Sequence, residues 1–167
     1  MMRLIFILII LGICAILVVP SFANSDRPME QGMPIQEMHQ LISQDEIVNL
    51  TDEFMNILVQ ETDEDYQVKA YEDKASLLQA FYHITTEEVV KPYVDTYYYE
   101  QNGALYIIPT ETPPWFDKQN DYDVLQLEEN KILVKQENQS DLYGAYRIDL
   151  ELTYATPGWK ITKITHH

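Results

Sequence analysis

The residues best suited to acid–base chemistry lie in two predicted helices near the middle of the chain. His83 and Asp95 are candidate bases, and Tyr97, Tyr98 and Tyr99 are candidate proton donors. A base inside an apolar pocket, with a donor opposite, is the arrangement an isomerase or dehydratase needs. Three consecutive tyrosines point in three directions on a helix, however, so they cannot all face one site. We favour a boundary role for His83 and a solvated position for Asp95.

The sequence offers fewer candidates for a nucleophilic or metal site than for acid–base chemistry. The one cysteine, Cys14, lies in the N-terminal apolar run, and no serine stands in a Gly-x-Ser-x-Gly elbow. Residues 117–128 carry oxygen side chains at the spacing of a calcium loop, but Tyr122 stands where that loop needs glycine. His166 and His167, the last two residues, would hold a transition metal only weakly. We therefore predict no catalytic residue, metal or cofactor.

A stiff aromatic segment, "IIPTETPPWFD" at residues 107–117, is the strongest candidate for binding. Its two prolines force an extended backbone that carries Trp115 and Phe116. In one interpretation these rings, with Tyr97 and Tyr98, form a rim that binds a small apolar ligand or a protein partner. In the other they fold back as a lid over the core, where their burial would contribute several kcal/mol. We favour the lid.

Three helices are predicted to position these residues. Apolar residues recur at helical spacing from residue 43 to about residue 60, from 73 to 84, and again from 85 onward. The predicted N-caps are Ser43, Asp73 and Thr85, with Glu46 and Glu88 as capping-box partners.

Two features complicate the end of the third helix. Pro92 lies inside its pattern and predicts a kink or a break into two pieces. Further on, Asn102-Gly103 is typical of a hairpin turn, but Gly103 is equally suited to end a helix. We predict that the helix continues to this point and that a strand follows from Ala104 to Pro109.

The second half of the chain has the period of β-strands. Strands are predicted at 122–127 and 131–137, joined by a turn at Glu129-Asn130, and a final strand at 159–164. The clearest alternation is in "YRIDLELTY", residues 146–154, whose apolar residues point one way and whose charged residues point toward water.

The N-terminal residues have the composition of an export signal. Arg3 is followed by an apolar run at 4–20, and the small residues Ser21 and Ala23 suit cleavage after Ala23. An uncleaved membrane anchor is the alternative, since the run is at the short limit for a spanning helix. Cys14 faintly resembles a lipidation site, but the apolar run continues beyond it, and we interpret it as an ordinary residue of the signal.

Charge limits the partners of this protein. The chain has 27 acidic residues against 11 Lys and Arg, a formal net charge of −16. Such a surface repels phosphate backbones and anionic lipid headgroups. We therefore predict no nucleic-acid partner, and membrane contact only through residues 4–20 if the signal is retained.

Helices followed by antiparallel strands predict an α+β fold, with three N-terminal helices packed on a curved sheet of four or more strands. The domain would occupy residues 43–165, after a spacer at 24–42. This order, with "GWKI" in the last strand, resembles the nuclear transport factor-like superfamily of cone-shaped domains. The combination "LYIIPTETPPW" followed by a strand meander is similar to a narrower family of exported proteins from Gram-positive, spore-forming bacteria. These resemblances imply a fold and a compartment but no activity, because the cone hosts enzymes and binding modules alike.

The sequence thus favours a secreted or extracytoplasmic module that binds a protein or a small ligand at or outside the cell surface. The alternative is a lyase- or isomerase-like enzyme that uses a residue inside the cone.

Overall fold

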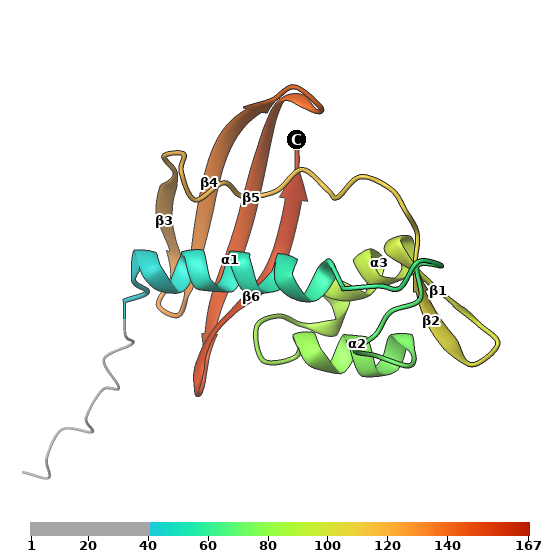
Figure 1. Cartoon of the computed structure of the whole chain (residues 1–167). Coiled ribbons are helices and arrows are strands. Elements are labelled where there is room, and N and C mark those ends of the chain that lie inside the picture. The colour runs from blue at the N-terminus through green and yellow to red at the C-terminus, as the bar shows by residue number, and fades with distance from the viewer. Residues whose placement is uncertain (1–40) are drawn as a thin grey trace, which may run out of the picture. The chain divides into compact units, whose positions relative to one another are not determined.

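The computed structural model describes residues 41–167, which form an α+β fold with three helices and two antiparallel sheets (Figure 1). The predicted signal or anchor at 1–23 lies outside the described residues, as does the spacer at 24–42 apart from its last two positions. Within the described part, none of the helices is long and apolar enough to cross a membrane.

The first two helices begin where the capping signals predict. Helix α1 spans Gln44–Leu58, and its N-cap Ser43 accepts a hydrogen bond from the Glu46 amide at 3.1 Å while the Glu46 carboxylate accepts one from the Ser43 amide. Helix α2 spans Lys74–Phe81, and Asp73 caps it in the same way. The predicted end of α1 near residue 60 is correct to within two residues.

The third helix differs from the prediction at its start. Helix α3 spans Glu87–Tyr97, and its N-cap is Thr86, not Thr85. Thr85 is buried, and its hydroxyl instead donates to the Ile161 carbonyl at 2.7 Å, so a tertiary contact takes the predicted capping group. The helix also runs without a break through Pro92.

The tyrosine-rich stretch after α3 is a hairpin, so the prediction of a longer helix is wrong. Strand β1 (Tyr98–Gln101) pairs antiparallel with β2 (Ala104–Ile107). Asn102 and Gly103 between them have φ angles of 52° and 77°. A two-residue hairpin turn of this type needs positive φ at both positions, which Asn-Gly tolerates best.

The main sheet has four antiparallel strands in sequence order: β3 (Asp123–Glu128), β4 (Lys131–Ser140), β5 (Gly144–Ala155) and β6 (Gly158–His166). The turn at Glu129-Asn130 is where the sequence predicts it. The alternation in β5 is confirmed, because Ile148, Leu150 and Leu152 are fully buried.

The opposite face of β5 is less exposed than the sequence predicts. Asp149 retains only 14% of its side-chain exposure. Arg147 Nε lies 3.2 Å from one of its oxygens, and His167 Nε2 lies 3.3 Å from the other. The charged face therefore carries a compact cluster and not a row of separately solvated groups.

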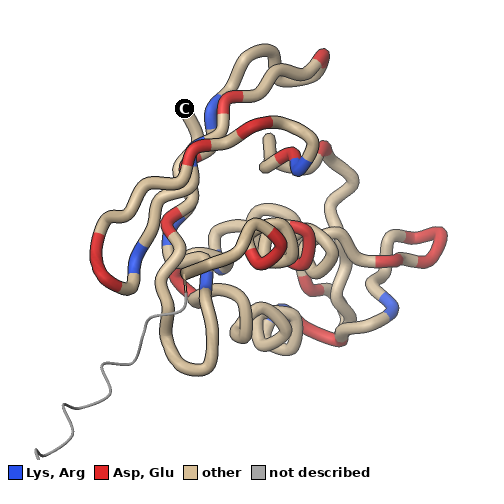
Figure 2. Tube along the Cα trace, turned by 90° about the vertical axis from the view of Figure 1, so that its left-hand side faces the viewer, with Lys and Arg blue, Asp and Glu red and all other residues tan. Residues whose placement is uncertain are grey.

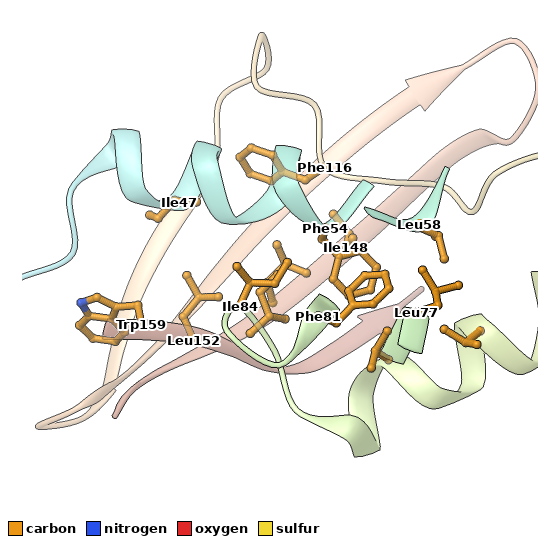
Figure 3. Close-up of a cluster of buried hydrophobic side chains, with 14 of the residues drawn as sticks. Ile47, Phe54, Leu58, Leu77, Phe81, Ile84, Phe116, Ile148, Leu152 and Trp159 are labelled. Carbon is orange, nitrogen blue, oxygen red and sulfur yellow. The ribbon is translucent and has the colours of Figure 1, made fainter. Parts of the chain in front are cut away.

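The core forms where helix residues meet the inner side of this sheet. In Figure 1, α1 runs across β4, β5 and β6. Phe54 from α1, Phe81 from α2 and Ile148 from β5 are fully buried and lie together (Figure 3). Their burial stabilises the domain without a disulfide, since the only cysteine lies outside the described residues.

Candidate functional site

The aromatic segment at residues 109–117 is held against helix α1. Trp115 stacks on Phe54 with ring centroids 4.7 Å apart and planes 18° apart, and its indole Nε1 donates to the Thr51 carbonyl at 3.1 Å. Phe116 is buried, and its ring meets Tyr122 edge-on at 5.1 Å. Both rings therefore turn toward the core, as the lid interpretation requires.

Polar side chains fix the backbone of the same segment. The amide of Asp117 donates to Gln136 Oε1 at 2.8 Å, and Gln136 Nε2 donates back to the Asp117 carbonyl at 2.7 Å. The hydroxyl of Tyr146 donates to the Trp115 carbonyl at 2.8 Å, and that of Tyr143 donates to the Thr112 carbonyl. Gln136 is itself buried, so a reciprocal amide pair joins the end of the segment to β4.

The two tyrosines predicted for the rim have different surroundings. Tyr98 is buried, its hydroxyl donates to the Leu58 carbonyl, and burial raises its pKa to about 12. Tyr97 keeps part of its surface exposed, and partial burial raises its pKa, with a smaller contribution from Tyr143. Of the four predicted rim residues, only Tyr97 and Trp115 are partly exposed.

The structure adds residues that the sequence reasoning did not place at this site. Tyr93 meets the edge of Trp115 at 6.4 Å, and its hydroxyl lies 3.0 Å from His166 Nε2. Burial raises the pKa of Tyr93 and lowers that of His166, where the neighbouring charge of His167 acts in the same direction. Tyr93 and Tyr97 are four residues apart on one helix row, and that spacing was the available signal for Tyr93.

The candidate acid–base residues His83 and Asp95 lie in separate polar contacts at the surface. His83 is exposed and lies 2.6 Å from Glu53 of α1. Asp95 contacts Lys91 and Lys74, which lower the pKa of its carboxyl. A carboxylate with a lowered pKa is a poor proton acceptor near neutral pH. Asp95 thus has the solvated position that we favoured, and its pairing with two lysines is an addition from the structure.

The third tyrosine of the triplet also lies at the surface. Tyr99 stacks on Tyr106 across the β1–β2 hairpin, with ring centroids 5.3 Å apart. Its ring is 40% exposed, and it follows the buried Tyr98 on the alternating faces of β1. The structure therefore brings His83, Asp95 and Tyr99 into three different contacts and not into one site.

The buried polar residues of the described chain are hydroxyls and amides: Thr51, Thr85, Gln136 and Asn138. Each has a hydrogen-bond partner, and Asn138 also receives the Asn120 side chain at 2.8 Å. Neither a carboxylate nor an imidazole belongs to this set. Thr51 bonds within α1, whereas the other three join separate segments of the chain. Neutral amides and hydroxyls are weak acid–base groups.

No group of three or more metal-ligating side chains occurs among residues 41–167. The stretch with calcium-loop spacing ends in strand β3, so Asp123 and Glu128 stand at opposite ends of an extended segment. The strand that the sequence predicts at residues 122–127 is therefore present, in place of a calcium-binding loop.

Strand β3 is the most exposed apolar element of the main sheet. All six of its residues are exposed, and Val124, Leu125 and Leu127 retain 45%, 46% and 47% of their surface. Leu125 lies opposite Leu133 of β4 in the ladder. The outer side of β3 pairs with no strand in the described part of the chain.

A wide polar depression lies beside the start of β3. It measures about 1130 Å³, and its lining includes Asp121, Asp123, Lys135, Glu137 and Arg147. The depression is open and mixed in charge, so it suits a polar or charged group from outside better than an apolar small molecule.

No protein-family model matches the chain, and comparison with curated proteins finds no match.

Proposed function

We propose that this protein is an exported binding module that contacts a protein partner through strand β3 and does not act by catalysis. The proposal includes the finer architecture implied by the sequence resemblance, a cone in which three N-terminal helices pack on a curved sheet. Export rests on the composition of residues 3–23.

The observation that carries this proposal is the exposure of β3. Val124, Leu125 and Leu127 are each nearly half exposed, while β4 and β5 bury most of their large aliphatic residues: Ile132, Val134, Ile148, Leu150 and Leu152. Three large apolar side chains on an edge strand, paired with β4 on one side only, are costly in water unless another segment covers them. An extended segment of another protein can cover both the side chains and the unpaired backbone groups.

The aromatic segment at 109–117 has a structural role in this proposal. Trp115 and Phe116 cover the core, and the Tyr98 hydroxyl bonds to the carbonyl of Leu58 at the end of α1. Tyr97 remains as the partly exposed member of the predicted rim. A small apolar ligand would have to displace Trp115 from Phe54, whereas β3 is accessible as it stands.

A site-specific photo-crosslinker at residue 125, installed in the cells that produce the protein, tests this proposal. We expect a discrete adduct with a protein at the cell surface or in the medium. The same crosslinker at Tyr82, which is 38% exposed on a different part of the domain, is the matched control and should give no such adduct. Equal yields of adduct from both positions, or no adduct from residue 125, would refute the proposal that β3 contacts a partner.

The same cultures can be used to test whether the protein is exported. N-terminal sequencing of the cell-free material should begin at Asn24 if the signal is cleaved after Ala23. A sequence beginning at Met1 in membrane fractions would favour the anchor.

A further inference from the structure

The two edges of the main sheet are not equivalent. At the β6 edge, Ile161 donates its amide to the Ile84 carbonyl at 2.8 Å and accepts the Thr85 hydroxyl at 2.7 Å. Residues 84–85, between α2 and α3, therefore cover part of the β6 edge. The β3 edge has no such cover within residues 41–167, so its outward backbone groups are open to a further strand.

The usable part of the β3 edge is short. The β3–β4 register is regular from Asp123 to Gln126 and then shifts before Glu128. The Gln126 side chain donates to the carbonyls of Glu128 and Lys131 and closes the turn. An added strand can therefore pair over about four residues, a length typical of short edge strands.

Acidic side chains stand at the start of this edge. Asp121 and Asp123 belong to no ion pair among the described residues, whereas Glu128 is paired with Lys131 at 2.9 Å. Lys135 lies opposite Asp123 in the ladder but makes no ion pair with it. Both aspartates line the polar depression, which leaves room for a cationic side chain beside them.

We infer that β3 takes up a short extended segment of a partner protein that has alternating apolar residues and carries Lys or Arg at the end that meets Asp121 and Asp123. The inference rests on the proposed function and specifies the chemistry of its partner. The added strand would continue the main sheet, and its basic end would enter the depression. Complementary charge at the rim of such a contact favours the correct register and raises the association rate.

A second copy of the chain fits this edge less well. Each copy has a net charge of −16, so two copies repel each other (Figure 2 shows how far acidic positions outnumber basic ones along the trace). Antiparallel pairing of two β3 strands over residues 123–126 would place Asp123 of one copy opposite Gln126 of the other. This stretch carries no Lys or Arg that could meet the aspartates.

Two labelled peptides test the inference on the protein purified in the form its cells make. Both alternate Val and Thr over six residues; one has two Lys at each end and the other has two Glu. We expect the Lys peptide to bind at least about tenfold more tightly than the Glu peptide in fluorescence anisotropy, and to weaken as salt rises. Equal affinity for the two peptides would overturn the inference.

Charge-neutral variants locate the contact. Asp121→Asn with Asp123→Asn should weaken the Lys peptide about tenfold. Glu64→Gln with Asp65→Asn removes the same charge from an exposed turn between α1 and α2 and is the matched control. If the control pair weakens binding as much as the β3 pair, the effect comes from net charge alone and the assigned site is wrong.

Proline substitution tests whether the peptide adds as a strand. Neighbouring residues of a strand direct their N–H groups to opposite sides, so either Val124→Pro or Leu125→Pro removes an outward donor. The other substitution breaks the β4 ladder and lowers the melting temperature. The variant that keeps the wild-type melting temperature should lose Lys-peptide binding, and retention of full binding by that variant would overturn strand addition.

The outcomes separate this inference from the proposed function. An adduct at residue 125 without Lys-peptide binding would leave β3 as a binding surface and reject a basic partner. An adduct of twice the chain's mass, together with dimers in sedimentation equilibrium, would identify a second copy as the occupant. The absence of both an adduct and peptide binding would reject both proposals.

Discussion

Two neighbouring stretches of this chain are apolar and extended, yet they have opposite surroundings. In residues 109–117, Trp115 and Phe116 turn inward, and Phe116 keeps only 8% of its surface exposed. In β3, which begins six residues later, Val124, Leu125 and Leu127 are all nearly half exposed. Composition alone does not distinguish a segment that covers the core from one that is left uncovered.

The difference lies in how many contacts hold each stretch. The aromatic segment is bound through the Trp115 indole on one side, and through Gln136 and Tyr146 on the other. Strand β3 is bound on one side only, by its ladder with β4. A segment held from both sides has little freedom to meet a partner, whereas a segment held from one side can bind another chain without rearrangement.

The largest expected effect is the loss of the Trp115 ring. Trp115→Ala removes the stack on Phe54 and the bond to Thr51, and large-to-small changes of this kind cost about 3–5 kcal/mol. Urea unfolding should show the midpoint falling steeply. Trp115→Phe keeps an aromatic ring on Phe54 and should cost clearly less. A midpoint for Trp115→Ala within error of the wild type would contradict the lid.

A smaller loss is expected when the amide pair behind the segment is removed. Gln136→Leu keeps a similar volume but leaves the Asp117 amide and carbonyl without their partner. Because Asp117 is exposed, water can replace part of these bonds, and we expect a total loss of about 1–3 kcal/mol. Gln139→Leu, three residues along β4 and exposed, is the matched control and should change stability little. Thermal and urea unfolding measure both. If the two variants are equally stable, Gln136 does not fix the segment.

The stability of the region around the aromatic segment should also depend on pH, through His166. Partial burial beside Tyr93 lowers the pKa of His166, so the unfolded chain binds the proton more readily than the folded one. Stability should therefore be highest above the unfolded pKa of about 6.5 and should fall as the pH drops below it. His166→Gln should flatten the melting temperature between about pH 6.5 and 5 relative to the wild type. An unchanged slope would show that His166 does not contribute.

Local signals in the sequence predict much of this fold. Ser43 and Asp73 mark helix starts because their side chains bond to amides only three residues away. The alternation of β5 is visible because the two faces of one strand meet different environments. These predictions succeed since each depends on short-range geometry.

The failures come from contacts between distant residues. Thr85 looks like a cap, but Ile161, far along the chain, takes its hydroxyl. Asn102-Gly103 suits either a helix end or a hairpin, and the pairing of Tyr98 with Ile107 selects the hairpin. The exposure of β3 could not be predicted from the sequence, because apolar residues on both faces are typical of a buried strand. The arrangement of the other elements shows that none of them covers β3 within residues 41–167.

The smallest expected effect is the one that separates the two stretches most clearly. Val124→Thr with Leu127→Thr removes apolar surface from β3 and leaves a β-branched residue, which suits a strand, at both positions. Because both side chains are already half exposed, the free energy of unfolding should change by no more than about 0.5 kcal/mol per site, as for other surface positions. Lys-peptide binding should nevertheless fall, since the apolar contact is lost. Urea unfolding and anisotropy on the same preparation measure the two quantities. A large loss of stability would show that β3 contributes to the packing of the core, and would remove the physical reason for treating it as a binding surface.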